Sequence, residues 1–154
     1  MRYFFEPILF LLLSSCFLSS CSGEGHGDEH GIDAAADSFA TNYFNYRFVR
    51  SLQFCTPESE KWVRFAASNI IQEDIDTLRA QASGASYEIV DVDERNDTSA
   101  IVQYRVSDFM LIDTLGRAGR IVSDCVFDVS FVFRQGKWLV KMEAPLQSER
   151  QSRD

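Results

Sequence analysis

Residues 125–140, CVFDVSFVFRQGKWLV, decide the fold of this chain. Up to residue 133 every odd-numbered position is apolar, while Asp128 and Ser130 lie between them. This period of two is typical of a strand that buries one face. Gln135-Gly136 then predicts a two-residue hairpin turn, and a further strand is expected over residues 137–143.

The same alternation continues upstream of this hairpin. It predicts strands over residues 85–92 and 100–107, joined by a turn at residues 95–97. A loop is expected over residues 113–119, which contain two glycines. Because short connections join antiparallel neighbours, the four strands are expected to form an antiparallel meander.

Before residue 85 the apolar spacing changes to three and four, which is typical of amphipathic helices. One helix of about 20 residues is expected from Asp33 toward residue 54. Thr56-Pro57-Glu58 predicts the start of a second helical stretch that reaches about residue 81, with a break near Ser68-Asn69. Helices followed by a meander predict an α+β fold, with N-terminal helices packed on a curved four-strand antiparallel sheet.

This order of elements, with the closing strand Gly136-Lys137-Trp138-Leu139-Val140, resembles the nuclear-transport-factor-two-like (cystatin-like cone) superfamily. More narrowly, it resembles small bacterial envelope lipoproteins that carry a domain of unknown function within that superfamily. The resemblance covers about residues 33–145. It implies a cone in which the sheet wraps the long helix and leaves a pocket at the open end.

The N-terminal residues 1–20 are predicted to be a lipoprotein signal peptide. Their apolar run is too short to span a bilayer, which takes about 20 apolar residues. Leu18-Ser19-Ser20-Cys21 resembles a lipobox, so Cys21 is the expected lipidation site. Leu13-Ser14-Ser15-Cys16 offers the same pattern, which leaves Cys16 as an alternative. Cys21 is favoured because cleavage before it removes the whole apolar run.

This assignment divides the remaining chain into three parts. Residues 21–32 are expected to be a lipidated cysteine with a flexible acidic tether, 33–146 a cone-like α+β domain, and 147–154 a frayed polar tail. The lipid anchor makes the bilayer a partner. The expected location is the bacterial cell envelope, with the outer membrane favoured, on its periplasmic or surface side.

Charge limits the other partners. The formal net charge is -8, and an acidic protein repels phosphate backbones, which argues against nucleic-acid binding. The outer sheet face mixes apolar and charged residues, which predicts a monomer or a weak homodimer.

Histidine is absent from residue 33 onward, which excludes Ser-His-Asp and Cys-His catalysis within the domain. His26 and His30 flank Asp28 and Glu29 in the tether, but a glycine-rich segment gives such ligands no supporting shell. The sequence therefore predicts no metal site and no cofactor.

Cys55 and Cys125 form an even pair once Cys21 is assigned to lipid. In an oxidising compartment they are candidates for a disulfide. Two buried free thiols are an equal alternative, because spacing alone does not show that the side chains meet.

Asp108 is the candidate for catalysis. Alternation along residues 102–106 carries Asp108 onto the inward face, where burial would raise its pKa and make it a general base. The resemblance supports this role, since ketosteroid isomerase and related dehydratases of the superfamily use a pocket Asp in this way. In the alternative, a bulge turns Asp108 outward while Phe109 and Leu111 turn inward.

Aromatic side chains are candidates for a ligand pocket. The predicted pocket residues are Phe39, Tyr43, Tyr46, Tyr104, Phe127 and Trp138. The favoured hypothesis is a non-catalytic module that binds a small ligand or an envelope protein. The alternative is a dehydratase or isomerase that uses Asp108.

Overall fold

The computed structural model describes residues 31–112 and 114–149. The helical segments are α1 (Ile32–Tyr43), α2 (Phe48–Ser51), η1 (Leu52–Phe54), η2 (Pro57–Ser59), α3 (Glu60–Ser68) and α4 (Gln72–Ala80). The strands are β1 (Ser86–Asn96), β2 (Ser99–Ser107), β3 (Phe109–Leu111), β4 (Arg120–Val122), β5 (Cys125–Arg134) and β6 (Lys137–Val140). Helices precede strands, which confirms the predicted α+β class.

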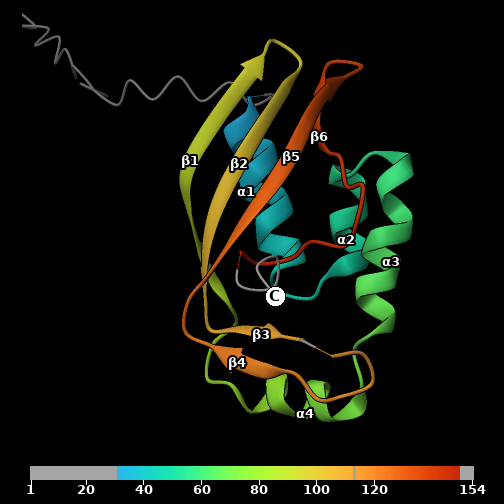
Figure 1. Cartoon of the computed structure of the whole chain (residues 1–154), viewed down its shortest axis with the longest axis vertical. Coiled ribbons are helices and arrows are strands. Elements are labelled where there is room, and N and C mark those ends of the chain that lie inside the picture. Colours follow the sequence, from blue (N-terminus) through green and yellow to red (C-terminus); the bar gives the residue numbers. More distant parts are fainter. Residues whose placement is uncertain (1–30, 113, 150–154) are drawn as a thin grey trace, which may run out of the picture.

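The main sheet has four antiparallel strands in the order β1-β2-β5-β6, as predicted. It curves along its length and α1 lies against it (Figure 1). Helix α3 stands away from the sheet, and α4 lies at the end of the molecule where β3 and β4 are found (Figure 1). No helix in the described ranges is long and apolar enough to cross a bilayer.

The core lies between α1 and the sheet. Phe39 packs edge-on against Phe131, with ring centroids 6.3 Å apart, and both side chains are fully buried. Tyr104 is also buried, and its hydroxyl donates a hydrogen bond to the carbonyl oxygen of Ala36 at 3.0 Å. This bond satisfies the one polar atom of a large core side chain and fixes α1 on the sheet.

The predicted hairpin turn at Gln135-Gly136 is confirmed. Both residues have positive φ, +52° and +78°, as a type I′ turn requires. The following strand is shorter than the predicted 137–143, because β6 ends at Val140. Beyond it the N–H of Lys141 still donates to the carbonyl oxygen of Ser130 on β5 at 2.9 Å. The next N–H, that of Met142, donates instead to Ser59 Oγ at 2.7 Å, so the helical layer replaces β5 as the partner there.

The long N-terminal helix expected to reach residue 54 is interrupted, and this part of the prediction is wrong. Helix α1 ends at Tyr43, and Tyr46 has a φ of +60°. The N–H of Arg47 donates to the carbonyl of Asn42 at 2.8 Å, and that of Tyr46 to the carbonyl of Tyr43 at 3.0 Å. These two bonds form a Schellman ending, in which Tyr46 takes the left-handed position that glycine usually occupies. The predicted break near Ser68-Asn69 is confirmed, since α3 ends at Ser68.

The loop expected over residues 113–119 is flanked by β3 and β4, which pair as a small second sheet. Val106 pairs with Cys125 in the main sheet, and Phe109 pairs with Val122 in the small one. Each strand thus advances three residues between the two pairs. The small sheet is therefore the same hairpin after a bend, and the bend lies at Asp108, whose φ is +56°.

Candidate functional site

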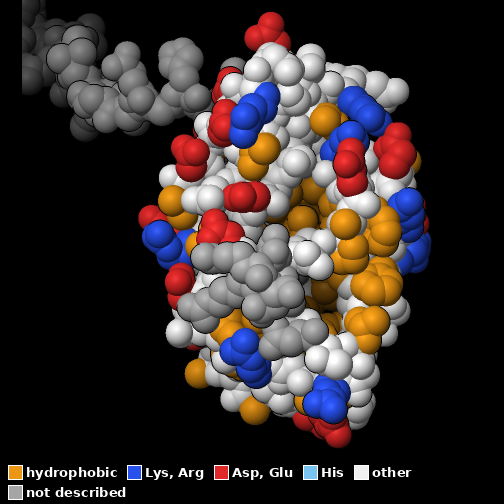
Figure 2. Space-filling view, in the orientation of Figure 1, with side chains coloured by type: hydrophobic (Ala, Val, Ile, Leu, Met, Phe, Trp, Pro, Cys, Tyr) orange, Lys and Arg blue, Asp and Glu red, His pale blue; other side chains and the backbone are white. Residues whose placement is uncertain are grey.

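An apolar cleft of about 370 Å³ opens between the helical layer and the β3–β5 side of the sheet. Its described lining residues are Tyr43, Tyr46, Phe48, Phe65, Ala66, Asn69, Ile70, Phe109, Met110, Leu111, Ile112, Leu115, Phe127, Pro145, Leu146 and Gln147. Figure 2 shows hydrophobic side chains gathered in a hollow on the side where Figure 1 places α2 and α3. The volume lies within the range of small-ligand sites, about 300–1,000 Å³.

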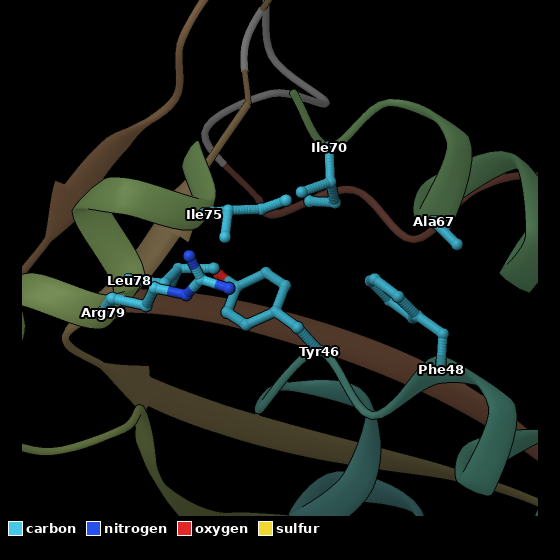
Figure 3. Close-up of a pocket in the computed structure, with 7 residues that line it drawn as sticks. All are labelled: Tyr46, Phe48, Ala67, Ile70, Ile75, Leu78 and Arg79. Carbon is cyan, nitrogen blue, oxygen red and sulfur yellow. The ribbon is translucent and has the colours of Figure 1, made fainter. Parts of the chain in front are cut away.

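A second hollow of about 470 Å³ adjoins the first, since Tyr46, Phe48 and Ile70 line both. In Figure 3 the rings of Tyr46 and Phe48 rise from the segment after α1, and Ile75 lies opposite them on α4. A more open groove beside α2 also shares Tyr46 and Phe48. We call the three together the helix–sheet cleft, and these two aromatic residues are its common wall.

Tyr46 is held at this wall by the backbone of β3. Its hydroxyl donates to the carbonyl oxygen of Met110 at 3.1 Å and accepts from the N–H of Met110 at 2.8 Å. Its ring stacks on Phe109 at a centroid distance of 5.7 Å. A non-glycine residue in the left-handed region costs of order 1 kcal/mol, and these contacts compensate for it. The break in the first helix therefore brings an aromatic side chain to the cleft.

Helix α4 is positioned by a buried carboxylate. Asp74 is fully buried and accepts hydrogen bonds from the N–H of Ile71 at 2.9 Å and the N–H of Gly119 at 2.7 Å. A Cβ on Gly119 would come within 2.7 Å of the Met110 side chain, so only glycine fits this approach. The two hydrogen bonds of Asp74 hold the α4 side of the cleft, where Ile75 lies, against the β3–β4 hairpin.

The C-terminal segment forms another wall. Pro145, Leu146 and Gln147 line the cleft, and Ser148 is fully buried. The N–H of Glu149 donates to the carbonyl oxygen of Val126 at 3.0 Å. The prediction of a frayed polar tail from residue 147 is therefore wrong for residues 147–149, because this backbone bond docks them on β5.

The polar groups of the cleft are few. The Tyr43 side chain is 5% exposed, and its hydroxyl makes no hydrogen bond with any residue in the described ranges. Burial raises the pKa of Tyr43 above its ordinary value, and the same cause raises the pKa of Tyr46. Both hydroxyls are thus neutral near neutral pH, and the Tyr43 hydroxyl can donate to or accept from a ligand.

The structure brings together only some of the predicted pocket residues. Tyr43, Tyr46 and Phe127 line the cleft. Phe39 and Tyr104 are fully buried in the core. The remaining candidate, Trp138, lines a separate surface groove beside Phe54 and the start of α1, so it is not part of this site.

Asp108 does not continue the inward alternation. It is exposed, whereas Phe109 and Leu111 are buried, so the outward alternative from the sequence is the one observed. The positive φ of Asp108 shifts the alternation by one residue at the bend. Asp108 lines none of the described hollows of the helix–sheet cleft, which removes the geometric basis for its role as a pocket general base.

Cys55 and Cys125 are both buried, and no disulfide joins them. Cys55 pairs with Val140 in an isolated backbone β-bridge, and Val140 in turn pairs with Phe131 on β5. Cys125 lies six residues from Phe131 along the same strand, a distance of about 20 Å. A disulfide requires Cα atoms within about 7 Å, so the two cysteines do not pair in this fold. Burial raises the pKa of the Cys55 thiol to about 12.

Sequence reasoning did not assign Phe48, Ile70 and Met110 to the site. Ile70 belongs to the apolar face of the second helical stretch, and Met110 belongs to the apolar run 109–112. The sequence therefore predicted that both side chains are buried, but not where in the fold they lie. Phe48 becomes a wall residue only because the chain turns at Tyr46.

Within the described ranges, no group of three or more His, Cys, Asp or Glu could hold a metal ion.

The predictions for the N-terminal segment lie outside the described residues. These are the signal peptide, the lipidation sites Cys21 and Cys16, and the tether with His26 and His30. They stay predictions.

Comparison with known proteins finds similarity among solved structures. No family model matches the chain, and no curated protein matches it. Among solved structures it is similar to an NTF-2-like protein of unknown function from Shewanella oneidensis MR-1. The TM-score is 0.49 and the sequence identity 10%, over 72% of this chain and 92% of that chain. The likeness concerns the fold, and the resemblance to envelope lipoproteins stays a prediction.

Proposed function

We propose that this chain is a lipid-anchored binding protein of the bacterial envelope, and that its helix–sheet cleft holds a small apolar ligand without transforming it. The observation that carries the proposal is the cleft itself. About 370 Å³ of space is lined mostly by aromatic and aliphatic side chains, together with Asn69, Gln147 and the Tyr43 hydroxyl, which has no hydrogen-bond partner among the described residues. Apolar walls with a few fixed polar groups are the usual composition of a small-ligand site.

The chemistry of the lining supports binding rather than catalysis. The described lining residues include no histidine, cysteine, lysine or carboxylate. The hydroxyl of Tyr46 already donates its hydrogen bond to the carbonyl oxygen of Met110. The raised pKa values of Tyr43 and Tyr46 make both hydroxyls poor proton donors at neutral pH.

Binding is tested by filling the cleft. Ala66 lines it from α3, so Ala66→Phe would place a ring in the space and leave the helix register unchanged. The protein is prepared by expressing the full chain. We then measure the affinity of the protein for N-phenyl-1-naphthylamine, an uncharged fluorescent probe. We expect Ala66→Phe to weaken probe binding at least tenfold, since one tenfold step corresponds to about 1.4 kcal/mol.

The matched control is Ala80→Phe, which adds the same ring on an exposed position of α4 that lines no described hollow. It should bind the probe like the unsubstituted protein. Equal affinities of both variants and the unsubstituted protein would refute a ligand site in the cleft.

The anchor is proposed from Leu18-Ser19-Ser20-Cys21. A lipidated Cys21 would hold the domain at the outer membrane through more than one acyl chain, which is enough for stable attachment. The full chain is expressed in bacteria with labelled palmitate. Cys21→Ser should abolish labelling, and Cys16→Ser should not. Labelling that survives Cys21→Ser would overturn the assignment.

A second candidate function is protein binding at the mouth of the cleft. Val49 is 83% exposed and Leu115 is 64% exposed, and both line the cleft region. Exposed large apolar side chains beside a hollow are common in interaction sites. If an envelope protein docks here, Val49→Ser with Leu115→Ser should abolish its co-purification. Unchanged co-purification would reject this second function.

A further inference from the structure

Three arginines surround the helix–sheet cleft. Arg79 lines the hollow between α4 and Tyr46, and its side chain extends from α4 toward the middle of the view in Figure 3. Arg47 and Arg50 line the open groove beside Phe48. Because Tyr46 and Phe48 belong to all three hollows, the three arginines border one connected region.

These arginines have no counter-ions in the described structure. None of the three lies within 4.0 Å of a carboxylate of the described residues, whereas four other arginines do: Arg64, Arg95, Arg105 and Arg134. Arg64 pairs with Glu60 at 2.6 Å, and Arg134 pairs with Glu58 at 3.0 Å.

The local charge is opposite to that of the whole chain. The chain carries 23 acidic and 15 basic residues, yet the described lining of the cleft contains three arginines and no acidic side chain. Unpaired cations beside low-dielectric walls concentrate positive potential there. A guanidinium group binds a carboxylate through charge-assisted, often bidentate hydrogen bonds.

We propose that the ligand of this cleft is a single-chain fatty carboxylate. Its aliphatic chain lies against Phe48, Ile70 and Ile75, and its carboxylate faces the arginines. The inference rests on the proposed function and adds the class of ligand. The three hollows have volumes of about 370, 470 and 610 Å³, and each lies within the range of a site for one small ligand.

The head group is tested with three probes of one chain length: decanoate, decanol and decylammonium. Binding to protein from the full chain is measured by isothermal titration calorimetry. We expect decanoate to bind at least tenfold more tightly than decanol, and decylammonium to bind more weakly than decanol. Added salt should weaken decanoate binding, because exposed charges are screened.

The arginines are tested by the combined variant Arg47→Gln, Arg50→Gln and Arg79→Gln. In this variant the ratio of decanoate to decanol affinity should fall to about one. The control is Arg95→Gln, which removes an exposed arginine that pairs with Asp93 and lines none of these hollows. It should keep the ratio of the unsubstituted protein.

Each outcome separates this inference from the proposed function. Equal binding of decanoate and decanol by the unsubstituted protein would overturn the head-group assignment while the apolar site stands. A preference for decanoate that survives the combined variant would also overturn it. If none of the three probes binds, both the inference and the proposed ligand site fail.

Discussion

Removing one oxygen atom from Tyr46 should destabilise the fold substantially. Tyr46→Phe keeps the ring, its stacking on Phe109 and its contact with Phe48, and it deletes only the hydroxyl. That hydroxyl satisfies both the N–H and the carbonyl oxygen of Met110, a residue that is 1% exposed. The variant therefore leaves two buried backbone groups without their partner.

The magnitude follows from the number of groups left unpaired. A buried backbone group without a partner costs about 1–3 kcal/mol. Two such groups give an upper value near 6 kcal/mol, and water that enters from the adjacent cleft recovers part of it. We expect Tyr46→Phe to lower the free energy of unfolding by about 2–4 kcal/mol. This is a large share of the roughly 5–15 kcal/mol that stabilises a typical domain.

The assay is urea unfolding followed by circular dichroism, together with hydrogen exchange at the Met110 amide. The matched control is Tyr87→Phe. Its hydroxyl bonds to Thr41 and Asp37 in a half-exposed position, so water can replace the lost bonds. Tyr87→Phe should cost about 1 kcal/mol or less. The Met110 amide should exchange faster only in Tyr46→Phe.

Two results would refute this reasoning. Equal losses of stability in the two variants would show that the Met110 bonds contribute no more than exposed ones. An unchanged exchange rate at the Met110 amide would show that the Tyr46 hydroxyl does not protect it. Either result would also remove our explanation of why Tyr46 tolerates a φ of +60°.

Three other predictions concern pH, thiol reactivity and the hairpin turn. Burial raises the pKa of Tyr43 and Tyr46 above 10.0, so the unfolded chain loses these protons first; their contribution to stability is complete below about pH 10 and declines at higher pH. A urea midpoint that stays constant from about pH 9 to about pH 11 would contradict this. Cys55 and Cys125 are buried and no disulfide joins them, so iodoacetamide should label them in urea without reductant but not in the native protein; mass spectrometry showing labelling only after reduction would reveal a disulfide instead. Gln135→Asn should raise the unfolding free energy by about 0.5 kcal/mol, because Asn-Gly is preferred in a type I′ turn, and a lower melting temperature would reject this.

Much of the fold follows from local sequence pattern. The alternation in residues 125–133 and the Gln135-Gly136 turn predicted β5 and its hairpin with β6, and the structure confirms both. Thr56-Pro57-Glu58 predicted a helical start, which is observed as η2 followed by α3. These features depend on neighbours within a few residues, where hydrophobic period and turn chemistry are decisive.

The cleft follows from interactions between distant residues. The first helix ends before Tyr46 because the Tyr46 hydroxyl forms hydrogen bonds with the backbone of Met110, which lies 64 positions away in the sequence. Asp74 fixes α4 through Gly119, 45 positions away. A helical pattern in the sequence continues through Tyr46, since no local residue marks the break. Only a contact from another element makes the left-handed conformation stable there.

The sequence by itself determined the class of the fold, the order of its elements and the absence of histidine chemistry from the domain. The tertiary structure decided which side chains face the cleft. It turned Asp108 to solvent, kept Cys55 and Cys125 apart, and placed Tyr46 at the cleft wall. The physical reason is that Asp108 and Tyr46 both adopt positive φ, a conformation that costs free energy locally and persists only where the surrounding fold supports it.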